Sequence, residues 1–186
     1  MTSAIEYDFQ EARRLEGLIA QIANGEQEAL GALYEATRAA VYGFALSLLR
    51  HGGDAEDALQ ETYLRVWKAA PGYTPQGKPM AWVLTITRNL ARSKQREAGR
   101  FQALDEAGWE RYFSGLPAVS TEEAILLSAA LARLSAEEKQ IVMLHAVAGL
   151  KHRELSEMMG QPLGTLLSKY ARAVKKLRMT MEDGEQ

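Results

Sequence analysis

The side chains best suited to a chemical role lie near the C-terminus, on one face of a helix predicted to begin at Pro162. Hydroxyl and cationic groups recur on that face at helical spacing: Thr165, Ser168, Lys169, Arg172 and Lys176. Between positions 165 and 178 the chain has five basic residues and no acidic one. Because such groups bind the phosphates and base edges of a major groove, the face predicts contact with duplex DNA. A solvated basic helix is the alternative interpretation.

A tight turn before this helix supports a helix-turn-helix over residues 150–178. A short helix is predicted over 152–159, and Gly160 can adopt the backbone conformation that ends it. Pro162 suits the first position of the next helix, because it lacks the amide hydrogen that would be unpaired there. The short helix, the break and the longer basic helix together favour DNA reading over a merely solvated face.

A second candidate surface lies on a helix predicted over 54–70, with Asp54 as its N-cap. The buried face of this helix is expected to consist of Leu59, Tyr63, Val66, Trp67 and Ala70. A separate face places one leucine among polar side chains: Asp57, Gln60, Glu61, Leu64 and Lys68. An apolar anchor with a polar rim is typical of a protein-binding surface. A solvated acidic face with one exposed leucine explains the same pattern.

A third candidate surface lies on a helix predicted over 80–97, whose apolar face carries Val83, Ile86 and Leu90. The opposite side carries Arg88, Asn89, Arg92 and Arg96. Trp82 lies near the start of this helix, just after a loop that contains Tyr73. Cations beside aromatic rings can hold the phosphates and stack the bases of a single nucleic-acid strand. For Trp82 itself, a place in the core is the favoured alternative.

The helices that carry these surfaces belong to an all-helical pattern. Most of the chain shows helical periodicity, and alternating strand patterns are missing. Two more helices are predicted over 8–23 and 27–49, and a loop rich in proline and glycine covers 71–79. Helices resume at Thr121, and Ser135 with Glu138 forms a capping box.

The periodicity fades over 98–120, although this stretch is too apolar for a solvated tether, with Phe101, Trp109, Tyr112 and Phe113. We expect a flexible linker that docks on a domain of this chain or on a partner. The sequence therefore predicts an all-α protein with two helical domains, residues 1–97 and residues 121–186, the second a helix-turn-helix.

Composition narrows the function classes. The chain has 186 residues, 47% of them hydrophobic, and no cysteine, which excludes disulfides and thiolate metal sites and fits a cytoplasmic protein. No apolar run is long enough for a membrane span, and the acidic N-terminus does not resemble a signal peptide. The net charge of −2 argues against a generic DNA-coating protein, so local basic patches must decide which polyanion is bound.

Catalytic chemistry is not expected. His51, His145 and His152 are scattered, and none has metal-ligand spacing to another histidine or to a pair of carboxylates. His152 is expected at the surface or as a capping residue. The sequence contains no phosphate-binding glycine loop and no nucleophile elbow. We therefore predict no catalytic residue, no metal and no cofactor.

The combined pattern resembles a bacterial RNA polymerase sigma factor of the extracytoplasmic-function (ECF) subfamily. The resemblance covers about 27–97 and again 121–181, with its most specific segments at 54–68, at 81–91 and around Gly164, Thr165 and Ser168. Three motifs in this order and spacing are a specific signal.

The resemblance implies a role for each surface. Its segment for docking on the clamp helices of core RNA polymerase matches Asp57, Gln60, Glu61, Leu64 and Trp67, although Trp67 can serve the fold alone. The 71–79 loop, with Tyr73 and Lys78, and the helix that follows it would recognise and open the downstream promoter element and capture a base of the melted non-template strand. Arg88 and Asn89 match the family's Arg-Asn pair. The helix-turn-helix would read the upstream element of the duplex.

The recognition helix departs from the family pattern in two places: Leu167 stands where a cation is common, and Lys169 where an arginine is common. A lysine is a point charge that cannot make the two-pronged contact of arginine to guanine. We therefore expect base readout to differ here, while the positioning of phosphates is retained.

Partners and rival functions follow from the same resemblance. We expect core RNA polymerase, promoter DNA and an anti-sigma factor as partners, without membrane insertion. One rival is a helix-turn-helix repressor or activator that binds duplex DNA as a dimer. Another is a sigma-like decoy that binds polymerase or another protein without opening DNA. The repressor leaves the acidic 54–68 surface unexplained.

Overall fold

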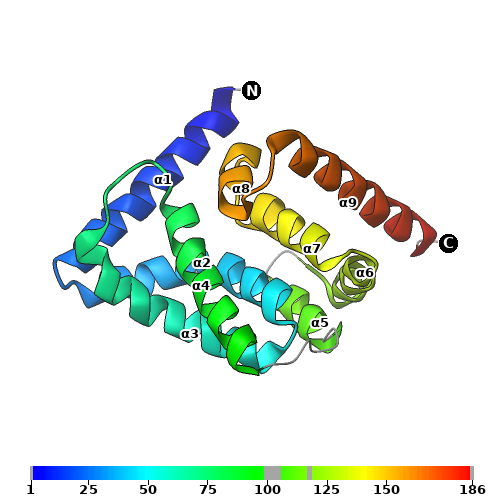
Figure 1. Cartoon of the computed structure of the whole chain (residues 1–186), viewed down its shortest axis with the longest axis horizontal. Helices are drawn as coiled ribbons and strands as arrows, with labels where there is room; N and C mark the ends of the chain where they lie inside the picture. The colour runs from blue at the N-terminus through cyan, green and yellow to red at the C-terminus, as the bar shows by residue number, and fades with distance from the viewer. Residues whose placement is uncertain (1, 99–105, 117–118, 185–186) are drawn as a thin grey trace.

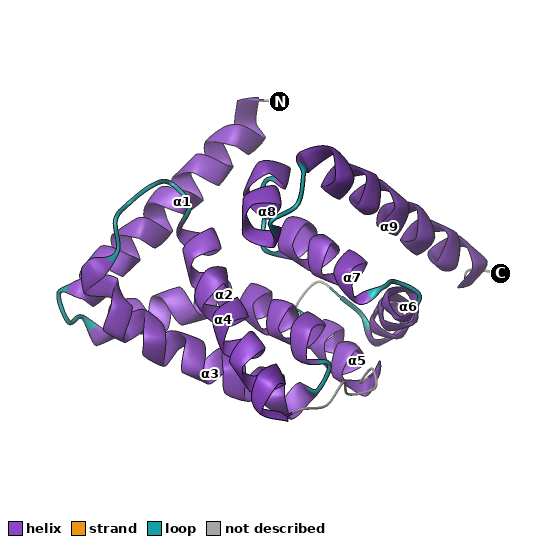
Figure 2. Ribbon diagram, in the orientation of Figure 1, coloured by secondary structure: helices purple, strands orange, loops and turns teal. Residues whose placement is uncertain are grey.

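The computed structural model describes residues 2–98, 106–116 and 119–184, and these segments contain helices, turns and coil but no β-strand (Figure 2). The all-α prediction is therefore confirmed. The elements follow the chain as α1 (Thr2–Ala23), α2 (Gln27–Leu49), α3 (Gly52–Ala69), η1 (Ala70–Gly72), α4 (Pro79–Ala98), α5 (Glu106–Ser114), α6 (Thr121–Ala132), α7 (Ala136–Val142), η2 (Met143–Val147), α8 (His152–Met159) and α9 (Leu163–Gly184).

Helices α1 to α4 form a first module around α2, the helix that the other three contact (Figure 1). Leu33, Val41 and Phe44 of α2 are almost completely buried in its core. They meet Ile19 of α1 and Val66 of α3 in one apolar cluster. Burial of this cluster stabilises the module mainly through the hydrophobic effect. It also fixes which faces of α3 and α4 remain at the surface.

Helices α6 to α9 form a second module. Ser120 and Ser135 each close a capping box, with Glu123 and Glu138 respectively, and the second of these confirms the predicted box. Gly160 ends α8 with φ +66°, as the break predicts, and α8 spans the predicted residues. Leu166 and Ala173 of α9 are buried, whereas Met181 is 41% exposed.

Four helix starts differ from the predictions. Helix α4 begins at Pro79 instead of residue 80. Helix α3 begins at Gly52, and its N-cap is His51, whose Nδ1 accepts the amide hydrogen of Asp54 at 3.2 Å. The prediction of Asp54 as N-cap is therefore wrong. Helix α9 begins one residue after Pro162, at Leu163. Helix α1 begins at Thr2, six residues before the predicted start.

The predicted linker contains a helix that docks on this chain. Trp109 of α5 is only 1% exposed, and α5 packs against α6 and, more lightly, against α2. Tyr112 and Phe113 are buried with it. The prediction that this segment docks is thus confirmed, and it docks on other helices of the same chain. Phe101 lies outside the described residues.

The two modules also contact each other directly. Helix α2 packs against α7 and η2, and α4 touches α8 (Figure 1). Gly43 of α2 sits where these elements converge, since a Cβ at this position would collide with Met143 of η2 and Tyr112 of α5. A glycine here allows the close approach. Leu144 and Leu155 of the second module belong to the same apolar cluster as the first module's core.

Candidate polymerase and nucleic-acid interfaces

The α3 face, made of Asp57, Gln60, Glu61 and Leu64, lies at the surface of the first module. Together with residues of α4 it lines an open depression of about 400 Å³. Leu64 is 59% exposed, more than any other large apolar side chain whose burial the structure describes. Trp67 differs from these four residues, because it is partly buried against the main apolar cluster.

Polar contacts hold the α3 face in shape. Glu61 pairs with Arg65 one turn further along at 3.1 Å, and Asp57 pairs with Lys94 of α4 at 3.2 Å. These exposed pairs stabilise the fold little, but they orient carboxylates around Leu64. Beneath them, the hydroxyls of Tyr63 and Thr37 are hydrogen-bonded at 2.7 Å, and burial raises the pKa of the Tyr63 phenol. This buried bond anchors α3 on α2.

The α4 face consists of Arg88, Asn89, Arg92 and Arg96. Asn89, Arg92 and Arg96, with Gln95, line an open depression of about 490 Å³. Asn89, Arg92 and Arg96 are exposed, so two cations and one amide face solvent on one side of the first module. Such a surface can bind the phosphates of a nucleic-acid strand electrostatically.

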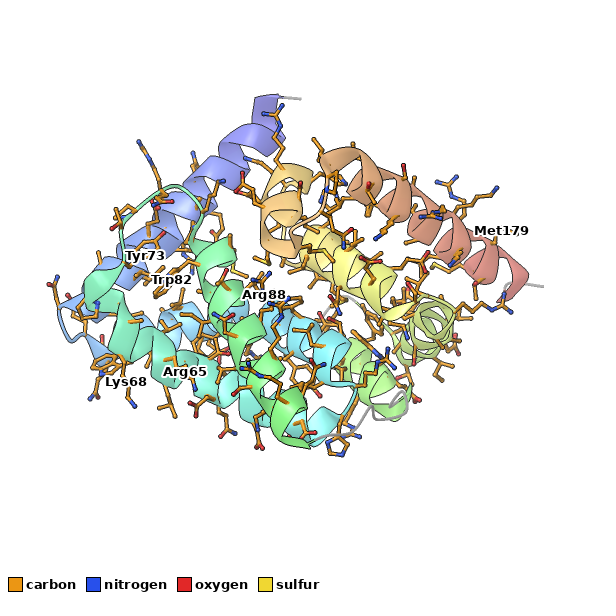
Figure 3. All side chains as sticks on the ribbon, in the orientation of Figure 1. Arg65, Lys68, Tyr73, Trp82, Arg88 and Met179 are labelled. Carbon is orange, nitrogen blue, oxygen red and sulfur yellow. The ribbon has the colours of Figure 1, made fainter. Side chains whose placement is uncertain are left out.

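Arg88 is placed differently from its neighbours. It is partly buried, and its guanidinium donates to the backbone carbonyl of Met158 in α8 (Figure 3). Its Nε has no hydrogen-bond partner among the described residues. Burial and the nearby Arg92 lower the pKa of Arg88, although it stays a cation at any ordinary pH. Arg88 therefore contacts the second module as well as belonging to the α4 face.

Lys78 makes a parallel contact just before α4. Its Nζ lies 3.2 Å from a carboxylate oxygen of Glu157, also in α8. Two predicted DNA-binding cations of the first module, Lys78 and Arg88, thus face the same short helix of the second. Tyr73, in the loop before Lys78, packs its ring on Trp82 with centroids 4.8 Å apart. Trp82 is partly buried against the main cluster, in keeping with the core interpretation.

The α9 face consists of Thr165, Ser168, Lys169, Arg172 and Lys176. Thr165, Ser168 and Arg172 are exposed. Lys169 is turned toward α7, where its Nζ lies 2.7 Å from Glu137, and Lys176 lies 2.8 Å from Glu138. Hydrogen bonds from Lys169 and Gln161 lower the pKa of Glu137. Arg172 is therefore the most available cation of the five residues.

The sequence missed an aromatic cluster between the two helices of the helix-turn-helix. The rings of His145 and His152 lie 4.0 Å apart, and each meets the ring of Tyr170 at about a right angle. The N-cap of α8 is Lys151, so the capping role expected for His152 is wrong, and His152 is partly buried as the first residue of the helix. His145 lies in η2 and His152 begins α8 after a turn, so no helical periodicity in the sequence relates the two histidines. In the described segments no group of three potential ligands could hold a metal ion.

Acid is expected to destabilise the protein through His152. Burial, and to a lesser degree the adjacent His145, lower the pKa of His152 below its ordinary value of about 6.5. In acid the unfolded chain therefore takes up this proton before the folded chain does, and the stabilisation is lost as the pH falls below about 6.5 toward the lowered value. Urea unfolding between pH 8 and pH 5 measures this loss.

A His152→Gln variant should show a shallower pH dependence than the wild type. Equal slopes for the wild type and His152→Gln would contradict the assignment to His152.

Comparison with known proteins identifies both modules. Residues 33–101 match Sigma-70 region 2, and residues 124–177 match Sigma-70 region 4. The chain is 30% identical over 175 residues to the ECF RNA polymerase sigma factor SigK of Mycobacterium ulcerans, covering 90% of this chain and 94% of that protein. It is 29% identical over 166 residues to SigL of Mycobacterium tuberculosis, covering 87% and 93%.

Two solved structures share the fold. One is CnrH in complex with the cytosolic domain of CnrY, with a TM-score of 0.64, 22% identity, and coverage of 91% of this chain and 98% of that chain. The other is RpoE in complex with the anti-sigma factor NepR from Bartonella quintana, with a TM-score of 0.61, 23% identity, and coverage of 80% and 94%.

Proposed function

This chain belongs to the ECF family of RNA polymerase sigma factors, and from that premise we propose which of its surfaces bind polymerase and which bind promoter DNA. A sigma factor directs transcription initiation by RNA polymerase and is not itself an enzyme. We assign polymerase binding and downstream-element opening to residues 1–97, and upstream-element binding to residues 121–186. Residues 98–120 connect the two.

The α3 face is the proposed docking surface for core polymerase. The observation that carries this assignment is the 59% exposure of Leu64 within a ring of acidic and amide side chains. A leucine that fills a pocket on the partner contributes affinity, and the surrounding Asp57, Gln60 and Glu61 give orientation and a rapid encounter with a basic surface. Trp67 is partly buried, and its proposed role is to support this face from beneath.

The α4 face and the 73–79 loop are the proposed site for the melted non-template strand. Asn89, Arg92 and Arg96 are exposed side by side, which suits them to the phosphates and base edges of an unpaired strand. Tyr73 offers an aromatic ring on the loop that leads into α4, packed on Trp82, and Lys78 offers a cation. Unstacking a base is then offset by new contacts in the protein.

The α9 face is the proposed reader of the upstream element. Thr165, Ser168 and Arg172 are exposed on the N-terminal half of α9, the part of a recognition helix that enters the major groove. Lys169 and Lys176 form ion pairs with Glu137 and Glu138 of α7. To bind a DNA phosphate, each lysine has to break its ion pair or to contact the phosphate and the carboxylate together.

Replacing Arg172 by alanine should weaken binding to duplex upstream-element DNA. The loss should be about 1–3 kcal/mol if Arg172 reads a base, and smaller if it contacts a phosphate. Fluorescence anisotropy with the labelled duplex measures the change, and the slope of affinity against salt separates the two cases. Arg178→Ala removes an exposed cation from another side of α9 and serves as the control. An affinity unchanged by Arg172→Ala would remove Arg172 from the site.

An anti-sigma factor is the proposed regulator, because the RpoE structure that shares this fold contains one. Action in the cytoplasm, where core polymerase is found, is part of the same proposal. No helix in the described part of the chain combines the length and apolar character needed to cross a bilayer.

Run-off transcription with sigma-free core polymerase over a library of randomised promoters tests the function. Transcripts from a defined subset of promoters are the expected result, and their sequences reveal both promoter elements. Polymerase binding without transcripts would favour a decoy. Duplex binding without polymerase binding would favour a repressor or activator.

A further inference from the structure

A single carboxylate oxygen of α1 gathers three hydrogen bonds from the loop that precedes α4. Oε1 of Glu16 accepts from the Tyr73 hydroxyl at 3.1 Å, from the Gln76 amide at 3.0 Å and from the Gly77 amide at 2.7 Å. The donors are 57 to 61 residues away in sequence. Glu16 is therefore the polar attachment point of this loop on α1, beside which the loop runs (Figure 1).

The loop also has a side-chain contact at each end: the Tyr73 ring packs on Trp82, and Lys78 pairs with Glu157 of α8. Its residues from Thr74 to Lys78 are exposed and form neither helix nor strand. Gly77 has φ +70°, a conformation that glycine adopts without strain, and its amide donates to Glu16. Hydrogen bonds to a charged acceptor are stronger than those between neutral groups. The bonds from Gln76 and Gly77 to Glu16 therefore hold the exposed stretch between those two contacts.

The same contact orients an aromatic ring. Tyr73 packs on Trp82 and points its hydroxyl at Glu16, which leaves one favoured direction for the ring (Figure 3). Burial and the Glu16 carboxylate raise the pKa of Tyr73 to about 12, so the phenol stays protonated and keeps donating.

We propose that Glu16 is a positioning residue for strand capture, which holds the 73–79 loop in the conformation that presents Tyr73 and Lys78 to the melted non-template strand. The inference rests on the proposed function of that loop. It assigns a promoter-opening role to α1, a helix that precedes the segment matched to Sigma-70 region 2 at 33–101.

The chemistry of the contact also defines a competing explanation. Two successive backbone amides and a hydroxyl converge on one anionic oxygen, and such an arrangement can bind a phosphate oxygen equally well. If the strand's phosphate used these donors, Glu16 would have to leave, and it would oppose strand binding. If Glu16 clamps the loop, as we propose, removing its carboxylate weakens strand binding. If Glu16 competes with the phosphate, removing its carboxylate strengthens strand binding.

The test uses holoenzyme assembled from core polymerase and the full chain. The probe is a single-stranded non-template oligonucleotide that carries the downstream element recovered from the promoter library. Glu16→Ala should weaken binding of this oligonucleotide about tenfold, because the loop loses three bonds to a charged acceptor. Affinity for core polymerase and for the upstream duplex should stay at the wild-type value, which a general folding defect would not allow.

Two further variants sharpen the result. Glu11→Ala removes another carboxylate from α1, one bonded to Arg14 of the same helix, and should bind the oligonucleotide as the wild type does. Glu16→Gln keeps an acceptor oxygen but not the charge, and should fall between wild type and Glu16→Ala. Amide hydrogen exchange at Gln76 and Gly77 should accelerate in Glu16→Ala, which reports directly on release of the loop.

Each remaining outcome decides against a stated claim. Tighter oligonucleotide binding by Glu16→Ala would overturn the clamp in favour of a phosphate competitor. Unchanged binding by Glu16→Ala, with normal binding by the wild type, would overturn the clamp alone. Failure of wild-type holoenzyme to bind the oligonucleotide would overturn the proposed function of the loop.

Discussion

Leu64→Glu is expected to abolish binding to core polymerase while the protein stays folded. The side chain is 59% exposed in the free protein, so a carboxylate there remains in water and costs the fold little. In the complex the same carboxylate would be buried in a pocket suited to leucine, beside Asp57 and Glu61. An unpaired buried charge costs several kcal/mol, and ~3 kcal/mol already reduces affinity more than a hundredfold.

Competition with a labelled sigma factor for core polymerase measures this loss, and circular dichroism checks the fold. Leu64→Ala should have a smaller effect, on the order of 1–2 kcal/mol, since it removes only the apolar contact. Ile125→Glu introduces the same charge at an exposed apolar residue of α6, away from the α3 face, and is the matched control. Near-normal affinity of Leu64→Glu with a native spectrum would reject the α3 face as the docking surface.

Trp109→Ala should lower the free energy of unfolding by about 3–5 kcal/mol, the largest stability effect expected of one substitution here. Trp109 is 1% exposed, and its ring contacts those of Tyr112 and Phe113 at centroid distances of 5.8 and 6.1 Å. Removing it leaves a cavity where α5 meets α6 and α2. Urea denaturation followed by circular dichroism measures the change.

Arg111→Ala, at an exposed position two residues further along α5, should change stability by less than about 0.5 kcal/mol. If Trp109→Ala were as stable as this control, α5 could not be an integral part of the folded core. The linker between the modules would then be a solvated tether, which the apolar residues of its sequence argue against.

The sequence predicted the helices best where local chemistry alone sets their limits. Helix α8 occupies 152–159 as predicted, because Gly160 ends it in the left-handed conformation. The capping box of Ser135 and Glu138 likewise depends on residues three apart. The exposure of Leu64 followed from helical spacing, since Tyr63 and Val66 take the buried side of α3.

Contacts between distant segments escaped prediction. Periodicity placed Arg88 on a free polar face, but not against the Met158 carbonyl of α8, and it did not show that Lys169 turns toward Glu137. The role of Glu16 is equally invisible in the sequence, because its donors come from a loop that lies some sixty residues away. Such pairings depend on how whole helices pack, which no window along the chain contains.

The contacts of α8 with Arg88 and Lys78 have a consequence for how the two modules affect each other. If the melted strand binds these two cations through a phosphate, as proposed, it competes with the polar groups of α8, and each weakens the other by the same factor. The strand would then act as an effector that loosens the contact between the modules, and separation of the modules would favour strand binding. Binding of one promoter element would in this way be coupled to the placement of the module proposed to read the other.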